Sequence, residues 1–194
     1  MIEPLNPGTG ARGTAESRLM DNYDDLQDLL LDLNHLDEAR RTEAYDFLVR
    51  MGGGVVPALV EDFDLIGGTA RLSVIRALGE IGDTRAVPLL LALMQTDNPA
   101  EYLYVSSFAA RSLGQIGDSK AVAGLVTTLS HDRPGPRRMA ATVLGNIRDE
   151  TAIPALVIAL KDPDARTQTV AAKALRKIGT DAALSAVEVW ERTQ

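Results

Sequence analysis

A six-residue phrase recurs along this 194-residue chain at a nearly constant spacing. The clear copies are Leu78-Gly79-Glu80-Ile81-Gly82-Asp83, Leu113-Gly114-Gln115-Ile116-Gly117-Asp118 and Leu144-Gly145-Asn146-Ile147-Arg148-Asp149. A weaker copy begins at Leu175 and the faintest at Leu48, so that successive copies start 30, 35, 31 and 31 residues apart. A repeat of this length is one supersecondary unit that cannot bury its apolar face alone. The units must therefore stack on one another to share a continuous core.

The residues around each phrase predict two helices per unit. Apolar residues recur at helical spacing before and after each phrase, and no strand-like alternation separates the copies. The second glycine of the phrase permits a left-handed residue that closes a helix, and the following Asp can cap the next one. Pro57, Pro88 and Pro154 fall early in the second helix, where a missing backbone donor costs least. Arg148 stands where the other clear copies have this glycine.

The pattern resembles the short HEAT repeat of about thirty residues, the kind found in bilin lyase subunits. The resemblance covers about residues 38–194, whereas the signatures of tetratricopeptide and ankyrin repeats are absent. It implies an all-α, right-handed α-α superhelix, here of about five helix pairs plus an N-terminal capping helix. It also implies that the helix ending in the phrase lines the concave side.

Two domain elements are expected from composition. Residues 1–20 are rich in Pro and Gly and predict a flexible N-terminal arm, and residues 21–194 form one solenoid domain. From Tyr23 onward, leucines on one face predict an acidic helix that caps and seals the first unit, or that docks a basic partner. About four extra residues near 96–101 predict a longer loop. Trp190 is expected to cover the last helix pair, or to act as a partner-facing anchor.

Charge is distributed unevenly along the chain. The net charge is −7, which disfavours binding to nucleic acid. Residues 21–64 carry 12 acidic and 3 basic side chains, whereas residues 65–194 carry 13 acidic and 15 basic ones. The chain has no cysteine, no basic-then-apolar leader and no apolar run long enough to span a bilayer. We therefore expect a cytoplasmic protein without membrane insertion.

The helices that end in the phrase carry the candidate binding residues. A basic row is expected from Arg76, Arg111, Arg138 and Lys173. An apolar row beside it is expected from Leu72, Phe108 and Met139, with Tyr104 at its margin. Arginine binds carboxylates with two hydrogen bonds, and an apolar row supplies buried area. The alternatives are that the basic residues are ordinary solvated charges, and that Phe108 and Met139 pack between helices.

Catalytic and metal-binding patterns are weak or missing. The two histidines, His35 and His131, are expected in loops and have no companion ligand at helical spacing. Gly52-Gly53-Gly54 is followed by valines and not by Lys and Ser, so it predicts a turn and not a phosphate loop. No residue of the chain is predicted to act as a catalyst, a cofactor ligand or a metal ligand.

Three functions remain open at this point. The first is a non-catalytic adaptor or scaffold that holds a protein partner, such as an acidic amphipathic segment, on the concave face. The second, implied by the resemblance, is a subunit of a bilin lyase or isomerase, or a phycobilisome-associated factor, holding a tetrapyrrole or its client. The third is self-assembly through the oppositely charged ends, with an oligomeric state that the sequence does not define.

Overall fold

The computed structural model describes residues 26–95 and 104–193, and these two ranges contain eleven α-helices and no strand. The helices are α2 (Leu26–Leu33), α3 (Glu38–Met51), α4 (Val56–Glu61), α5 (Gly68–Ile81), α6 (Val87–Met94), α8 (Val105–Ile116), α9 (Lys120–Thr128), α10 (Pro134–Ile147), α11 (Ile153–Ala159), α12 (Ala165–Ile178) and α13 (Asp181–Glu191). Four short 3-10 segments lie in the turns: η2 (Gly52–Gly54), η3 (Phe63–Leu65), η4 (Thr84–Ala86) and η5 (Glu150–Ala152).

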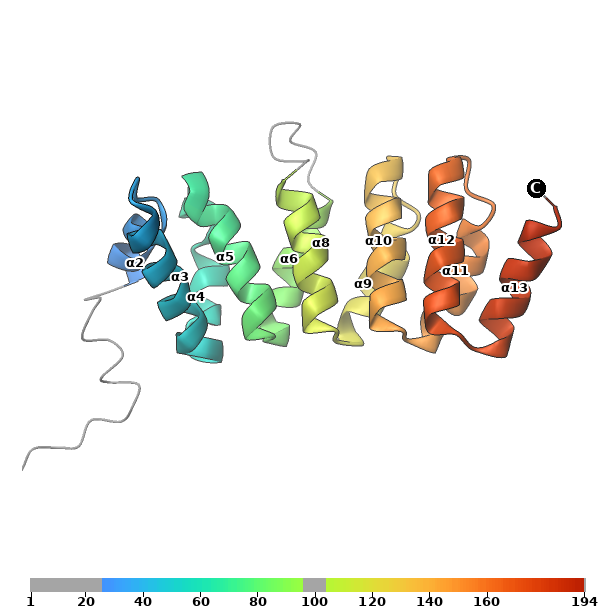
Figure 1. Cartoon of the computed structure of the whole chain (residues 1–194), viewed down its shortest axis with the longest axis horizontal. Coiled ribbons are helices and arrows are strands. Elements are labelled where there is room, and N and C mark those ends of the chain that lie inside the picture. The colour runs from blue at the N-terminus through green and yellow to red at the C-terminus, as the bar shows by residue number, and fades with distance from the viewer. Residues whose placement is uncertain (1–25, 96–103, 194) are drawn as a thin grey trace, which may run out of the picture.

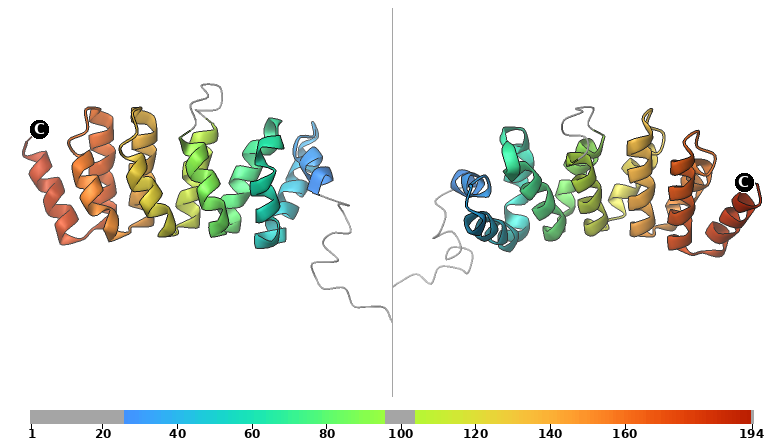
Figure 2. Two further views of the ribbon diagram at one scale, coloured as in Figure 1. Left: turned by 180° about the vertical axis from the view of Figure 1, so that it is seen from behind. Right: turned by 45° about the horizontal axis from the view of Figure 1, so that its top comes forward.

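The helices form an elongated array of five pairs, preceded by α2 (Figure 1). The first helices of the pairs, α3, α5, α8, α10 and α12, contact one another in sequence and make a first layer. The second helices, α4, α6, α9, α11 and α13, make a second layer, which the view from behind brings forward (Figure 2). The predicted all-α solenoid of five pairs with an N-terminal helix is therefore confirmed.

Apolar side chains between the layers form one continuous core. Each phrase contributes its leucine, because Leu48, Leu78, Leu113, Leu144 and Leu175 are all fully buried. Alanines fill the remaining positions on the inner faces of the first-layer helices, where larger side chains would hold neighbouring helices apart. Each unit thus buries its apolar face only against its neighbours, as stacking repeats require.

The turn that follows each phrase has the geometry that the sequence predicts. Gly82, Gly117 and Gly179 close α5, α8 and α12 in the left-handed conformation, and their N–H groups donate to the leucine of the phrase. Arg148 closes α10 in the same way at φ 59°. Within the described ranges it is the one non-glycine residue with positive φ. The following acid accepts a backbone N–H after α5, α8 and α10: Asp83 from Arg85, Asp118 from Lys120 and Asp149 from Thr151, each at 2.9 Å. After α12 the following residue is Thr180, whose hydroxyl accepts from Ala183.

A second set of polar contacts fixes the loops at the opposite edge of the array. Seven residues before four of the five phrase leucines, a long side chain reaches back to the preceding loop: Arg41, Arg71, Arg137 or Gln168. At this position α8 has Ser106, whose hydroxyl donates to the Leu93 carbonyl. The Nη1 atom of Arg137 donates to the carbonyls of His131 and Asp132, both at 2.8 Å. Arg41 holds two carbonyls of its own loop in the same manner. Arg137 also makes a buried two-bond ion pair with Asp162, at 2.7 Å for each bond. These contacts fix the orientation of each pair relative to the next.

The first glycine of the phrase lets consecutive first-layer helices approach closely. A methyl group on Gly79 would lie 2.7 Å from Cα of Ser112, and one on Gly145 would lie 2.7 Å from Cα of Ala174. Backbone therefore meets backbone at the α5–α8 and α10–α12 contacts. A methyl group on Gly114 would come no nearer than 3.4 Å, and its neighbour there is the side chain of Asn146. The α8–α10 contact is consequently wider than the other two.

Several sequence predictions lie outside the described residues. They concern the N-terminal arm at residues 1–20, Tyr23 in the capping helix and the longer loop near residues 96–101. The rest of the capping helix is observed as α2, which buries Leu29 and Leu33. Trp190 is partly buried and packs against the core, in agreement with a covering role at the last pair.

The difference in helix spacing predicts that a change from glycine to alanine affects stability differently at Gly145 and Gly114. Gly145→Ala is expected to lower the free energy of unfolding by about 1–3 kcal/mol, because the methyl group overlaps the backbone of α12. Gly114→Ala is expected to leave stability unchanged or to raise it by up to about 1 kcal/mol, since alanine favours the helix and has room. Thermal unfolding of the two variants measures this. Equal losses at both positions would contradict a wider α8–α10 contact.

The left-handed conformation of Arg148 makes a second prediction. Arg148→Gly is expected to raise the free energy of unfolding by up to about 1 kcal/mol, because glycine adopts positive φ without the penalty of a Cβ. The matched control is Gly117→Ala, which places a Cβ at φ 63° and should lower stability by a similar amount. A chemical denaturation series reports both, and destabilisation by Arg148→Gly would show that its side chain stabilises the turn.

Candidate functional site

The exposed face of the first layer carries most of the residues that the sequence singled out. Arg76, Arg111 and Lys173 occupy the same register, two residues before the phrase leucine, and all three are exposed. Thr142 occupies this register on α10. Arg138 lies one helical turn earlier on α10, closer to the loop edge. The structure therefore places three of the four predicted basic residues in one row, and the fourth beside it.

Two of these cations are engaged with neighbouring side chains. The guanidinium carbon of Arg76 lies 4.8 Å from the centre of the Tyr45 ring of α3, a cation–π distance. Burial raises the pKa of the Tyr45 phenol, which keeps this ring neutral beneath Arg76. Arg138 Nη1 lies 3.1 Å from Oδ2 of Asp164, the residue that caps α12. Hydrogen bonds from Thr167, and then this arginine, lower the pKa of the Asp164 carboxyl.

Arg111 and Lys173 are different, because neither side chain has a hydrogen-bond or ion-pair partner within residues 26–95 and 104–193. Arg111 is also the predicted cation that lies beside the wide α8–α10 contact. An exposed guanidinium without an internal partner keeps its five donors available for an external carboxylate.

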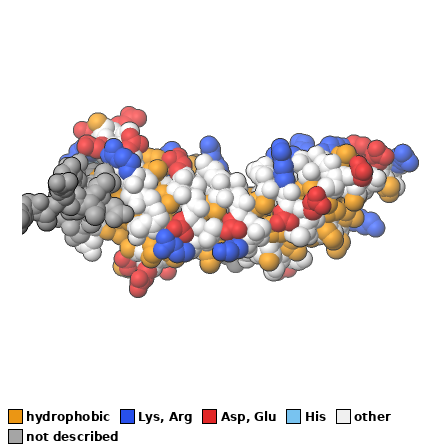
Figure 3. All heavy atoms as spheres, turned by 90° about the horizontal axis from the view of Figure 1, so that it is seen from below, with side chains coloured by type: hydrophobic (Ala, Val, Ile, Leu, Met, Phe, Trp, Pro, Cys, Tyr) orange, Lys and Arg blue, Asp and Glu red, His pale blue; other side chains and the backbone are white. Residues whose placement is uncertain are grey.

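A groove of about 440 Å³ lies between α8 and α10 at this point. Its lining combines residues of both helices: Ser107, Ala110, Arg111, Gly114, Gln115, Met139, Thr142, Val143 and Asn146. Buried Ala110 and Val143 and the partly buried Met139 give it an apolar floor. Figure 3 shows the outline of the molecule indented about midway along its length. The wide Gly114 contact explains the groove, since tight backbone packing closes the equivalent space on either side.

The polar side chains of the groove are uncharged except for Arg111. Gln115 and Asn146 present amides from facing positions of consecutive phrases, and Thr142 adds a hydroxyl. Asn146 is held by Lys177 of α12, whose Nζ donates to its Oδ1 at 2.7 Å. Among the described residues, no acidic side chain lines the groove. The arrangement can therefore accept an apolar group on its floor while donating hydrogen bonds to an anionic group at its rim.

The predicted apolar row is divided by the structure. Leu72, Phe108 and Met139 are partly buried and pack against the core, and Met139 also faces the groove. Tyr104 is 63% exposed. It shares a separate surface pocket of about 380 Å³ with Leu72, between the start of α5 and the start of α8. The structure thus brings Arg111 and Met139 together, and separately Leu72 and Tyr104.

Sequence reasoning missed the position of the groove. The residues two places after the phrase leucine, among them Gln115 and Asn146, recur in register and mark one face of the first layer. However, all three clear copies carry the same first glycine, and the difference in spacing depends on what the next helix places against it. No pattern within a single copy carries that information.

No metal-binding group is found in the described part of the chain, where no three His, Cys, Asp or Glu side chains converge. His35 and His131 lie in loops, as predicted, and each Nδ1 accepts a backbone N–H, from Asp37 and Arg133 respectively. Of the helices described, none is long and apolar enough to cross a membrane.

Comparisons with known proteins agree with the architecture. A family model described as HEAT repeats matches residues 68–141 and 122–190. A search of curated proteins gives no match. Among solved structures, the complex of CpcE and CpcF of phycocyanin lyase from Nostoc sp. PCC7120 is similar, with a TM-score of 0.53 and 23% identity over 100% of this chain and 73% of that one.

Two further solved structures give lower TM-scores. An engineered protein is 25% identical over 84% of each chain, with a TM-score of 0.47. Human deoxyhypusine hydroxylase in complex with glycerol is 18% identical over 90% of this chain and 87% of that one, with a TM-score of 0.41. The likeness to the lyase complex shows a shared fold.

Proposed function

Because this chain belongs to the HEAT-repeat family, we propose that it is a protein-binding scaffold whose partner lies in the groove between α8 and α10. The observation that carries this proposal is the wide contact at Gly114, which opens an apolar floor beside an arginine that has no partner among the described residues. The partner is a segment that pairs apolar side chains with carboxylates, as an acidic amphipathic helix does.

The chemistry of the groove supports an acidic partner in particular. Arg111 can bind a carboxylate through two parallel hydrogen bonds, and the nearby amides and hydroxyl can satisfy further oxygens. Met139 offers an adaptable apolar surface to a side chain of the partner. Arg76 and Lys173, in the same register on α5 and α12, extend positive charge to both sides and would steer an acidic segment toward the groove.

The test uses a fluorescent helical peptide that carries leucines along one face and glutamates along the other. Arg111→Glu is expected to weaken binding at least about tenfold, because it replaces the carboxylate-binding group with a like charge. Binding to the unaltered protein should also weaken as salt is added. Fluorescence anisotropy measures both effects.

The matched control is Lys120→Glu, which makes the same charge change on exposed α9 in the second layer. It should leave the affinity within about twofold, since surface charges more than a Debye length apart are largely screened. Equal losses from the two variants would show that net charge, and not the groove, governs binding, and the proposal would then fail.

A second candidate function is that of a subunit of a bilin lyase. It is favoured by the likeness to the complex of CpcE and CpcF of phycocyanin lyase, which joins two subunits. In such a role the groove would hold a linear tetrapyrrole, with Arg111 binding a propionate and the apolar floor contacting the rings. No nucleophile of this chain would be required if the client protein supplies it.

The visible absorption spectrum of phycocyanobilin distinguishes this candidate from the first. A lyase subunit should shift the absorption when the protein is added, alone or together with its partner subunit, and Arg111→Glu should reduce the shift. The control is again Lys120→Glu, which should leave the shift intact. An unchanged spectrum under both conditions would contradict the lyase function.

A further inference from the structure

A second surface, at the N-terminal end of the array, has the character of a docking site. The loop and helix residues Leu31, Leu36 and Leu65 are 68%, 97% and 84% exposed. We call these three leucines, with the cavity that Leu31 and Leu65 line, the N-terminal patch. Large apolar side chains gathered at one place on a surface mark a site that another molecule covers.

The cavity of the N-terminal patch is shaped by α2 and the turn that follows α4. It has a volume of about 310 Å³, and Leu26, Leu30 and Ile66 form its floor. Leu31 and Leu65 stand at its rim, and Leu31 also adjoins Leu36 along the outer side of α2. Asn34 fixes the two walls, since its Oδ1 accepts the N–H of Ala70 at 2.8 Å and its Nδ2 donates to Gly67 at 3.2 Å.

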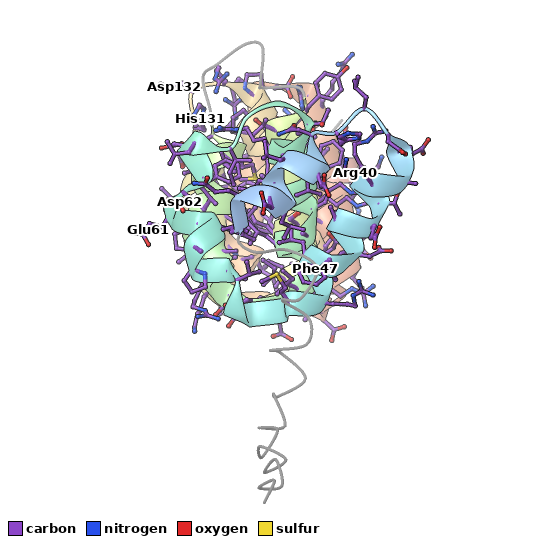
Figure 4. All side chains as sticks on the ribbon, turned by 90° about the vertical axis from the view of Figure 1, so that its left-hand side faces the viewer. Arg40, Phe47, Glu61, Asp62, His131 and Asp132 are labelled. Atoms are coloured by element: carbon purple, nitrogen blue, oxygen red, sulfur yellow. The ribbon has the colours of Figure 1, made fainter. Side chains whose placement is uncertain are left out.

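The rim of the patch is acidic. Residues 26–67 contain nine acidic and three basic side chains. Glu61, Asp62 and Asp64 lie just before Leu65 in the sequence and are exposed, and none has a side-chain partner within the described ranges. Of the three, Asp62 lines the cavity. Figure 4 shows Glu61 and Asp62 projecting from one side of this end of the molecule, with Arg40 on the other side.

The three arginines of this region are already engaged. Arg40 pairs with Asp32 at 2.6 Å, and Arg41 donates to the carbonyls of His35 and Leu36. Arg50 lies 6.0 Å from the centre of the Phe47 ring. Arg71, which shares a surface pocket with Asp64 and Leu65, donates to the Ile66 carbonyl at 3.2 Å and lies 4.4 Å from the centre of the Phe63 ring. Within the described ranges no ion pair neutralises the carboxylates beside Leu65, and they favour a cationic partner.

The other end of the array differs at the corresponding contact. In the register where Gly79, Gly114 and Gly145 face the next helix, α12 carries Arg176, which pairs with Glu191 of α13. A polar outer face of this kind is what a terminal repeat needs to stay soluble. The last helix, α13, also exposes Leu184 at 40% and Val189 at 62%, but these side chains are less exposed than Leu31, Leu36 and Leu65 of the N-terminal patch.

We propose that the N-terminal patch binds a basic amphipathic helix of a partner protein. The leucines of that helix would occupy the cavity and cover Leu31 and Leu65, and its lysines or arginines would pair with Asp62, Asp64 and Glu61. Helices bind hydrophobic grooves in this way through apolar residues at i, i+3, i+4 and i+7. This surface is separate from the α8–α10 groove and takes a partner of the opposite charge.

The test uses a fluorescent helical peptide with leucines on one face and lysines on the other. We expect saturable binding to the full-length protein, and at least about a tenfold loss of affinity in the double variant Leu31→Gln, Leu65→Gln, which removes both apolar anchors. The charge variant Asp62→Asn, Asp64→Asn should weaken binding and reduce its dependence on salt. All four side chains are exposed, so these changes leave the fold intact.

The matched control is Ile158→Gln on α11, a change of the same kind at a side chain that is 75% exposed. It should keep the affinity within about twofold. Equal loss in the control, unchanged binding in the double leucine variant, or no binding to the unaltered protein would each overturn the proposal. A dimer seen by light scattering that Leu31→Gln, Leu65→Gln dissociates would also overturn it, since a second copy would then occupy the patch.

The outcome does not depend on the function proposed for the groove. Arg111→Glu should bind the lysine peptide as the unaltered protein does, and Leu31→Gln, Leu65→Gln should bind the glutamate peptide normally. If no binding is found at one surface, the proposal for the other surface can therefore still be tested.

Discussion

Contact between the backbones of consecutive first-layer helices is the constraint on which the rest of this structure depends. At Gly79 and Gly145 the next helix lies so close that even a methyl group would overlap it. This closeness brings the phrase leucines together in one core and sets the rise from pair to pair. At Gly114 the same residue type meets only a side chain, and the helices separate. The α8–α10 groove thus forms at the position where this close backbone contact is absent.

The repeat defines most of the fold before any coordinates are considered. The phrase predicts a helix end, its glycine a left-handed residue, its acid a cap and the following proline a second helix, and each occurs at the expected place. The binding surface is harder to predict from the repeat. The row of Arg76, Arg111 and Lys173 follows from register, but the stacking of Arg76 on Tyr45 and the spacing at Gly114 depend on contacts between units.

Two surfaces of opposite character lie on one elongated molecule. The α8–α10 groove combines an apolar floor with an available cation, whereas the N-terminal patch combines exposed leucines with available carboxylates. A solenoid suits this arrangement, because each surface belongs to a few adjacent helices and neither must share residues with the other. Two partners, or two segments of one partner, could therefore be held at a fixed separation. Because the two surfaces have opposite charge, a segment that binds one of them would be repelled by the other.

The wide contact at Gly114 also affects where the array can bend. The α5–α8 and α10–α12 contacts on either side of it are close backbone contacts, whereas the α8–α10 contact between them relies on side chains. Repeat arrays deform most easily where the interface between neighbours is weakest. We therefore expect the part of the array from α5 to α12 to bend more easily between α8 and α10 than at the two neighbouring contacts, so that bending would widen or narrow the groove. A ligand bound in the groove would restrict this bending and hold the two parts of the array in one relative orientation.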